Sequence, residues 1–180
     1  VLTNDDKIAE RCRSSRNLCF QKSKRFYHER IGWNFRMTNI QAAIGVAQLE
    51  RLDETIARKR EIGAKYSDLL KDCPFLQLPV PETSYAKNVY WVYPVVLHDS
   101  CAMNATEAMS RLEQRQIGTR PFFYPMHKQP VFNKMGFFEK DLHPNSERIA
   151  GRGFYIPSGA GISDEQVQQV ASSLIEIVQR

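Results

Sequence analysis

The sequence predicts an α/β fold in which one long helix leads into a small α/β domain. Two observations support this prediction. Residues 39–71 repeat apolar side chains at steps of three and four, which is the period of an amphipathic helix. From residue 73 onward, short β-rich runs alternate with helical patterns, as expected for strands covered by helices.

The chain begins with a helical pattern over 5–16, followed by an irregular, aromatic and basic connection over 17–31. Thr38 and Gln41 then form a T-x-x-Q capping box, in which the hydroxyl and the amide each satisfy a free backbone N–H group. The long helix is therefore predicted to begin at about Asn39.

A continuous helix over 39–71 would be roughly 50 Å long, and such a length is typical of a helix that bridges two domains or bends. Cys73 and Pro74 end it, because the residue before a proline disfavours helical backbone angles. The predicted regions are the end of a large domain with a basic active-site loop (1–38), the bridging helix (39–72) and the small C-terminal α/β domain (73–180).

The small domain is predicted to alternate strands and helices. Strand signals occur at 75–78, 88–97 and 119–125, and helix signals run from Asn104 to Gly118, over 145–152 and from Ser163 to the end of the chain. The apolar run in 88–97 is continuous rather than alternating, which predicts a strand buried on both faces.

The composition is that of an ordinary folded chain, with 42% hydrophobic and 25% charged residues among 180. No apolar run reaches the roughly 18 residues of a membrane span, so no membrane partner is expected. The spacing of the four cysteines fits neither a C-x-x-C motif nor a zinc site. We interpret them as small buried hydrophobes in a reduced, cytoplasmic protein, with no metal site.

Basic residues are concentrated in residues 7–36, which hold nine of them against two acids. They are Lys7, Arg11, Arg13, Arg16, Lys22, Lys24, Arg25, Arg30 and Arg36. Basic residues interleaved with aromatics can bind single-stranded nucleic acid, form a plain solvated face, or receive phosphate groups. The motif that follows favours phosphates of small ligands, so no nucleic-acid partner is expected.

That motif is the loop before the long helix, where Asn34 and Arg36 precede the helix start. Amide and guanidinium groups so placed can approach an oxyanion or a phosphate. A second polar and aromatic cluster lies in the segment Thr119–His127, where two prolines restrict the backbone. There Arg120 is predicted to meet a diphosphate, Phe122 or Tyr124 to stack on a sugar or base, and His127 to contact substrate, whereas Phe123 is expected in the core.

Three strings together resemble one protein family. They are GWNFRMTNIQAAIG at 32–45, IGTRPFFYPMHKQPVF at 117–132 and ERIAGRGFYIPSGAGISDEQVQQV at 147–170. They are similar to the DegT/DnrJ/StrS family of PLP-dependent sugar aminotransferases, and the resemblance covers the whole chain. It implies the C-terminal part of a fold-type I PLP-dependent transferase. The lysine that holds PLP in the family would precede Val1, so no catalytic residue is expected here, and the chain alone is expected to be inactive.

The resemblance also implies the ligands. The cofactor would be pyridoxal 5'-phosphate, with Asn34 and Arg36 as cofactor-binding residues. In the family the matching asparagine crosses the dimer interface to the PLP phosphate of the other subunit, so a homodimer with shared active sites is expected. His28, in Y-H-x-x-I-G, would lie near the active site and bind substrate. The family often has histidine where Phe122 stands, so an imidazole role at that position does not carry over.

Among family members, the chain most resembles those that aminate a nucleotide-linked 4-keto-6-deoxy sugar such as GDP-4-keto-6-deoxymannose, usually with glutamate as amino donor. Two alternatives remain open: a sugar dehydratase, in which histidine replaces the PLP lysine, and a non-catalytic half-protein that acts as an interaction module. An interaction module should carry polar residues early in the long helix or self-associate. The apolar Ile40, Ala43, Ile44 and Ala47 favour the aminotransferase fragment.

Overall fold

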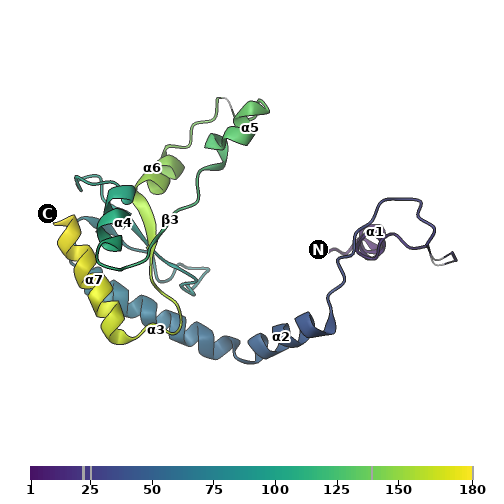
Figure 1. Cartoon of the computed structure of the whole chain (residues 1–180), viewed down its shortest axis with the longest axis horizontal. Coiled ribbons are helices and arrows are strands. Elements are labelled where there is room, and N and C mark those ends of the chain that lie inside the picture. The colour runs from purple at the N-terminus through teal and green to yellow at the C-terminus, as the bar shows by residue number, and fades with distance from the viewer. Residues whose placement is uncertain (22, 25, 139, 180) are drawn as a thin grey trace. The chain divides into compact units, whose positions relative to one another are not determined.

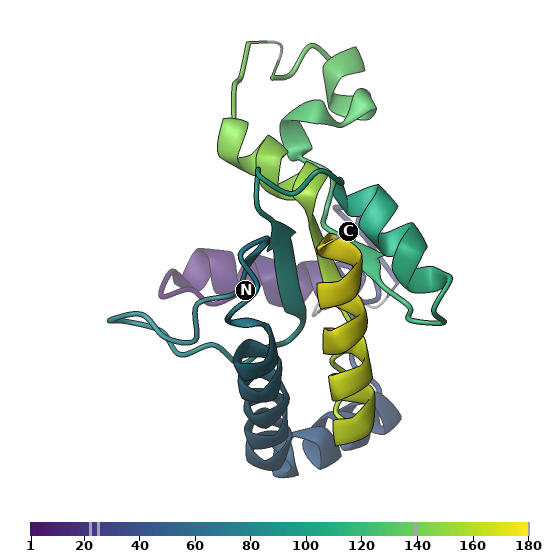
Figure 2. The ribbon, with the colours of Figure 1, turned by 90° about the vertical axis from the view of Figure 1, so that its left-hand side faces the viewer.

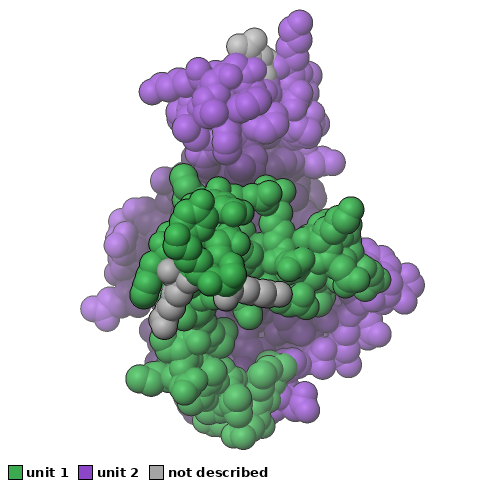
Figure 3. Space-filling model, turned by 90° about the vertical axis from the view of Figure 1, so that its right-hand side faces the viewer, with its two compact units in different colours: residues 1–52 green, residues 53–180 purple. Residues whose placement is uncertain are grey.

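The computed structural model describes residues 1–21, 23–24, 26–138 and 140–179. Two of the basic residues noted above, Lys22 and Arg25, lie outside these ranges. The chain forms two compact units, Val1–Leu52 and Asp53–Arg180, which Figure 3 shows in different colours. Within the described ranges, each helix is too short or too polar to span a lipid bilayer.

Helices α1 and α2 lie in the first unit (Figure 1). Helix α1 (Asp6–Arg16) begins at Asp5, whose carboxylate accepts hydrogen bonds from two free backbone N–H groups. Helix α2 (Asn39–Glu50) begins with the predicted capping box, in which both hydrogen bonds between Thr38 and Gln41 are present. The sequence therefore places both helix starts correctly.

The single long helix predicted over 39–71 is wrong. The structure contains α2 and a separate helix α3 (Leu52–Leu70), because Arg51 leaves the helical region with φ −107° and ψ 10°. Apolar periodicity continues across the break, since one non-helical residue does not erase the pattern of the turns on either side. The two halves fall into different compact units, and the bridging role of 39–72 stays a prediction.

The second unit is built on a four-stranded antiparallel sheet in the order β1-β2-β4-β3. The strands are β1 (Leu76–Gln77), β2 (Tyr93–Leu97), β3 (Arg120–Pro121) and β4 (Gly153–Ile156). In the central pair, Tyr93 lies opposite Ile156 and Val95 opposite Phe154. Four of the five β2 residues are buried, which confirms the prediction of a strand covered on both faces.

Helices cover this sheet. In addition to α3, these are α4 (Ala105–Glu113), α6 (Pro144–Arg152) and α7 (Asp164–Val178). The short 3₁₀ helix η1 (Met126–Lys128) and α5 (Pro130–Lys134) lie between β3 and α6 in the chain. Helices α3 and α7 run side by side (Figure 2). The core joins Tyr66 of α3, Leu112 of α4 and Leu174 of α7 to the buried residues of β2 and β4.

One strand prediction needs correction. The strand expected over 88–97 begins only at Tyr93, because Tyr90 has a positive φ of 50° that turns the chain. Its ring instead packs over Gly63, where an added β-carbon would lie 2.5 Å from the ring, and stacks on Tyr93. The elements η1, α5 and β4 were not predicted from the sequence, because they are short and carry weak periodic signals.

An ion-pair cluster ties α3 to the start of α7. Lys65 Nζ lies 2.7 Å from Glu61 Oε1 and 2.7 Å from Asp164 Oδ2, and Arg58 Nη1 lies 2.8 Å from Glu61 Oε2. Hydrogen bonds from Lys65 and then Arg58 lower the pKa of Glu61 to about 2. The carboxylate therefore stabilises the fold in its ionised form.

We expect Glu61→Gln to lower stability near neutral pH, since it removes the charge that binds Lys65 and Arg58. A lowered folded-state pKa contributes stability above the ordinary value of 4.5, and this contribution disappears as the pH falls toward about 2. The difference between wild type and variant in the free energy of unfolding should therefore shrink from about pH 7 to about pH 3 in urea titrations. Glu113→Gln is the control, since no ion pair of Glu113 occurs in the described part of the chain. A difference that does not vary with pH would contradict the assignment.

Candidate functional site

The loop that carries Asn34 is held against the end of α1 by backbone hydrogen bonds. Carbonyl groups in the last turn of a helix lack partners within the helix. Here the Ser15 carbonyl accepts from Trp33 N at 2.8 Å, and the Arg16 carbonyl accepts from Phe35 N at 2.9 Å. Asn34 lies between these two anchors and forms a β-bridge with Asn17, so its backbone position is fixed on both sides.

The turn after α1 is tightly packed. Leu18 and Cys19 both have positive φ, at 60° and 52°. A β-carbon on Gly32 would lie 2.5 Å from Cys19 N, so only glycine fits there without displacement of the turn. The Leu18 carbonyl accepts a hydrogen bond from Nδ1 of the exposed His28 at 2.7 Å. His28 Nε2 is then the ring nitrogen left for another partner.

Asn34 and Arg36 form a small set of donors. The Asn34 Oδ1 atom accepts from Arg36 Nε at 3.2 Å and from Arg36 N at 3.4 Å. The Asn34 NH₂ group and the outer guanidinium nitrogens make no further hydrogen bond among the described residues. Both side chains are exposed. Neutral amide and cationic guanidinium donors on a fixed backbone fit a phosphate group such as that of PLP.

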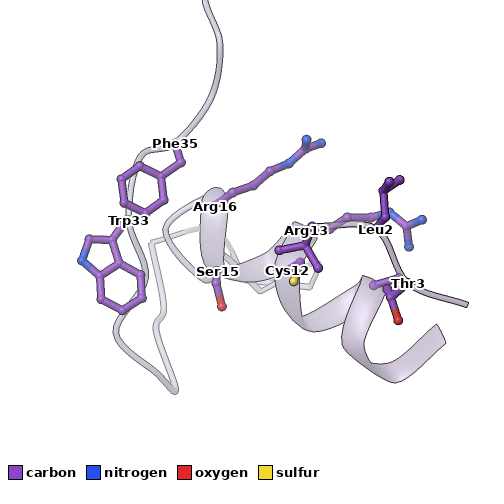
Figure 4. Close-up of a pocket in the computed structure, with 10 residues that line it drawn as sticks. Leu2, Thr3, Cys12, Arg13, Ser15, Arg16, Trp33 and Phe35 are labelled. Carbon is purple, nitrogen blue, oxygen red and sulfur yellow. The ribbon is translucent and has the colours of Figure 1, made fainter. Parts of the chain in front are cut away.

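The side chains of this segment alternate, as in an extended chain. Trp33 and Phe35 lie on the side opposite the Asn34–Arg36 pair, with stacked rings whose centroids are 6.1 Å apart. Together with α1 they line a hollow of about 680 Å³, which Cys12, Arg13, Ser15 and Arg16 of α1 also line (Figure 4). This hollow was not predicted from the sequence, although the alternation W-N-F-R was its signal.

In the second unit, β3 and the residues after it hold the other predicted cluster. Arg120 is exposed and pairs with Tyr155 across the sheet. Phe122 is half-buried and stacks on the Tyr155 ring at a centroid distance of 4.7 Å. Gly153 makes room for it, because a β-carbon there would lie 2.5 Å from the Phe122 ring. Phe122 thus packs on the sheet.

The next two aromatic residues face solvent. Phe123 is 77% exposed and Tyr124 is 58% exposed. The expectation that Phe123 lies in the core is wrong. Its neighbour Phe122 takes the packing position on Tyr155 instead, and successive residues of an extended segment point to opposite sides.

His127 is buried, with 9% of its surface exposed. Its Nε2 atom lies 3.0 Å from Glu147 Oε1, and Lys128 Nζ bonds the other oxygen of the same carboxylate. These two hydrogen bonds, Lys128 first, lower the pKa of Glu147 below its ordinary value. His143 adds a ring contact with His127, at a centroid distance of 4.7 Å. The geometry gives His127 protein partners and leaves little of it to a ligand.

The predicted site residues thus fall into two groups. His28, Asn34 and Arg36 lie in the first unit, and Arg120, Phe122, Tyr124 and His127 lie in the second. Their assignment to cofactor and substrate stays a prediction. Among the described residues, no cluster of three or more histidine, cysteine, aspartate or glutamate side chains could hold a metal ion.

Comparison with known proteins identifies the family. The sequence profile of the DegT/DnrJ/EryC1/StrS aminotransferase family matches residues 1–175. The chain belongs to this family. The family is PLP-dependent, and the resemblance stated from the motifs is confirmed.

Individual relatives agree with the family assignment. GDP-perosamine synthase of Vibrio cholerae is 35% identical over 174 residues, which are 97% of this chain and 46% of the relative. The crystal structure of S. venezuelae DesV is 27% identical, covers 99% of this chain and 46% of its own, and superposes with a TM-score of 0.82. Helicobacter pylori PseC, an aminotransferase of pseudoaminic acid biosynthesis, is 23% identical, covers 98% and 47%, and has a TM-score of 0.86, so it shows the fold.

The chain therefore spans about half the length of the relatives it matches. The predicted fold class is confirmed: a mixed α/β chain that corresponds to part of a fold-type I aminotransferase.

Substitution of Gly32 tests whether its close packing against the Leu18–Cys19 turn fixes the loop that carries Asn34. We expect Gly32→Ala to destabilise the protein by about 1–3 kcal/mol, because the new methyl group collides with the Leu18–Cys19 turn. Gly45→Ala is the matched control, since a β-carbon there meets nothing within 4 Å and alanine favours a helix by up to about 1 kcal/mol. Urea unfolding midpoints measure both. Equal effects of the two substitutions would show that the turn tolerates a side chain at residue 32.

Proposed function

We propose that this chain is part of a PLP-dependent aminotransferase that transfers an amino group from glutamate to a 4-keto-6-deoxy sugar nucleotide such as GDP-4-keto-6-deoxymannose. The observation that carries the proposal is the 35% identity to GDP-perosamine synthase over 97% of the chain. The enzyme would act in the cytoplasm, in the synthesis of polysaccharides such as an O-antigen. Residues 1–180 alone would be inactive, because the resemblance assigns the PLP lysine to a segment outside them.

The first unit would contribute to cofactor binding. Asn34 would donate its amide N–H groups to the PLP phosphate, while Arg36 would supply a positive charge beside it. The bonds from Arg36 to Asn34 Oδ1 support this, since they orient the amide and leave its donors for a ligand. When bound, PLP supplies an electron sink for the bond changes of amino transfer.

We further propose a homodimer in which Asn34 serves the active site of the neighbouring subunit. The surface of α2 supports an interface here: none of its residues is buried, and Ile40, Ile44 and Leu49 are exposed. Apolar side chains so exposed on one helix are typical of a surface that packs against protein.

The second unit would contribute to the sugar-nucleotide pocket. Arg120 is exposed at the end of the sheet, and in the described part of the chain no carboxylate pairs with it. A free guanidinium suits a diphosphate, with which it can form two parallel hydrogen bonds. His28, in the first unit, would bind substrate through its free Nε2 atom. In the second unit, the exposed Tyr124 could stack on a sugar or base.

Asn34→Ala in the full-length enzyme should weaken PLP retention without loss of the fold. Loss of a hydrogen bond to a charged group costs about 1.5–3 kcal/mol, so the dissociation constant should rise about ten- to a hundredfold. Equilibrium dialysis of PLP measures it, and Asn133→Ala, the same change in an exposed part of α5, is the control. An unchanged PLP affinity would refute the role of Asn34.

Arg120→Ala in the full-length enzyme should raise KM for the keto-sugar nucleotide by about tenfold and spare the half-reaction with the amino donor. This separation is expected when binding energy is lost for one ligand and not for the other. Stopped-flow measurement of each half-reaction distinguishes the two, with Arg111→Ala as a control on α4. Equal losses in both half-reactions would mean that Arg120 supports the fold.

A further inference from the structure

Glu147 holds two consecutive side chains of η1 at once. Its Oε1 atom lies 3.0 Å from His127 Nε2, and its Oε2 atom is bonded by Lys128 Nζ. A carboxylate has room for both donors, one on each oxygen. The Nε2 atom of the buried His127 is thus hydrogen-bonded to Glu147. Glu147 therefore links η1 to α6.

Helix α6 is itself fixed to the loop that follows β2. Arg148 Nε lies 3.1 Å from Asp99 Oδ1. The Arg152 guanidinium donates to the carbonyl groups of Leu97 at 3.0 Å, His98 at 2.6 Å and Cys101 at 2.7 Å. The same helix runs directly into β4. Glu147 therefore projects from a helix that is held at several points.

Residues 122–126, which we call the mouth segment, are thus anchored at both ends. Before the mouth segment, Arg120 and Pro121 pair with β4. After it, Glu147 holds His127 and Lys128. Within it, Phe122 packs on Tyr155, while Phe123, Tyr124 and Met126 remain 77%, 58% and 60% exposed.

Two features restrict the mouth segment further. Proline fixes φ at residues 121 and 125, and Pro125 is buried. Large aromatic side chains that stay exposed on a restrained backbone lose little conformational entropy when they bind a ring-shaped ligand. The contacts of Glu147 with residues 127–128 therefore restrict the positions in which the Phe123 and Tyr124 side chains are exposed.

We propose that Glu147 is a positioning residue for substrate recognition: through His127 and Lys128 it holds the mouth segment so that Phe123 and Tyr124 stack on the sugar nucleotide. This inference rests on the proposed function. It assigns the contact to Phe123 and Tyr124, and it assigns His127 to the support of the loop, with Phe122 packed beneath it.

A double-mutant cycle in the full-length, PLP-loaded enzyme tests this inference. The dissociation constant of GDP-mannose is measured by calorimetry for wild type, Glu147→Ala, Tyr124→Ala and the double variant. Glu147→Ala and Tyr124→Ala should each weaken binding about tenfold, and the double variant should be no more than about twofold weaker than Tyr124→Ala, because groups that act as one unit are not additive. PLP affinity should stay unchanged in all four.

Two further variants separate positioning from general support of the fold. Glu147→Gln keeps an acceptor for His127 but loses the charge that binds Lys128, so it should restore part of the affinity lost in Glu147→Ala, and it replaces that variant if Glu147→Ala does not fold. Glu107→Ala is the matched control, since Glu107 is another surface carboxylate bonded to an arginine, Arg111, at 2.6 Å. Glu107→Ala should bind GDP-mannose as wild type does.

The outcomes are distinct. Wild-type affinity in Glu147→Ala, or losses that multiply in the double variant, would overturn the positioning role while the proposed function stands. A wild-type enzyme that neither binds GDP-mannose nor transaminates a sugar nucleotide would overturn both. Hydrogen exchange of residues 122–128 adds a readout that is independent of ligand: it should accelerate in Glu147→Ala and Glu147→Gln, and unchanged exchange in both would exclude Glu147 as the anchor.

Discussion

The antiparallel pairing of β2 with β4 is the constraint on which the second unit depends. The flanking strands β1 and β3 each pair with one member of this central pair. Tyr93 and Phe154 are fully buried in it and provide the surface on which α3, α4 and α7 pack. Helix α6 leads into β4, so the pairing also determines where Glu147, Arg148 and Arg152 lie. The position of the mouth segment follows from the same two strands.

The first unit depends on a different requirement, the need of helix-end carbonyl groups for partners. The last carbonyl groups of α1 accept hydrogen bonds from the N–H groups of Trp33 and Phe35. These bonds place Asn34 and Arg36 on one side of an extended segment and the two aromatic rings on the other. The left-handed Leu18–Cys19 turn and Gly32 close this arrangement. A set of exposed hydrogen-bond donors thus arises from backbone bonds rather than from a buried core.

The hydrogen-bonded loop of the first unit and the sheet-anchored segment of the second unit suit the roles proposed for them. A cofactor phosphate is recognised by few, strong hydrogen bonds, and Asn34 and Arg36 on a fixed backbone would provide them. A sugar nucleotide contains rings and a diphosphate. The exposed aromatic residues would offer a stacking surface for the rings, and the neighbouring Arg120 would offer a positive charge for the diphosphate. The proposed function assigns both sets of residues to one reaction, although they lie in separate units of the chain.

The sequence by itself determined the family, the fold class, and the starts of α1, α2, α4 and α7, because motifs and caps at Asp5, Thr38, Asn104 and Ser163 act over three or four neighbouring residues. Only the tertiary structure decided the break at Arg51, the late start of β2, the existence of β4, and which of Phe122 and Phe123 is covered. Those features depend on contacts between distant residues, such as Tyr90 over Gly63 and Phe122 on Tyr155, which leave no periodic signal in the chain. For the same reason, the sequence showed His127 as one more polar residue in an aromatic segment, whereas the fold buries it against Glu147, twenty residues away.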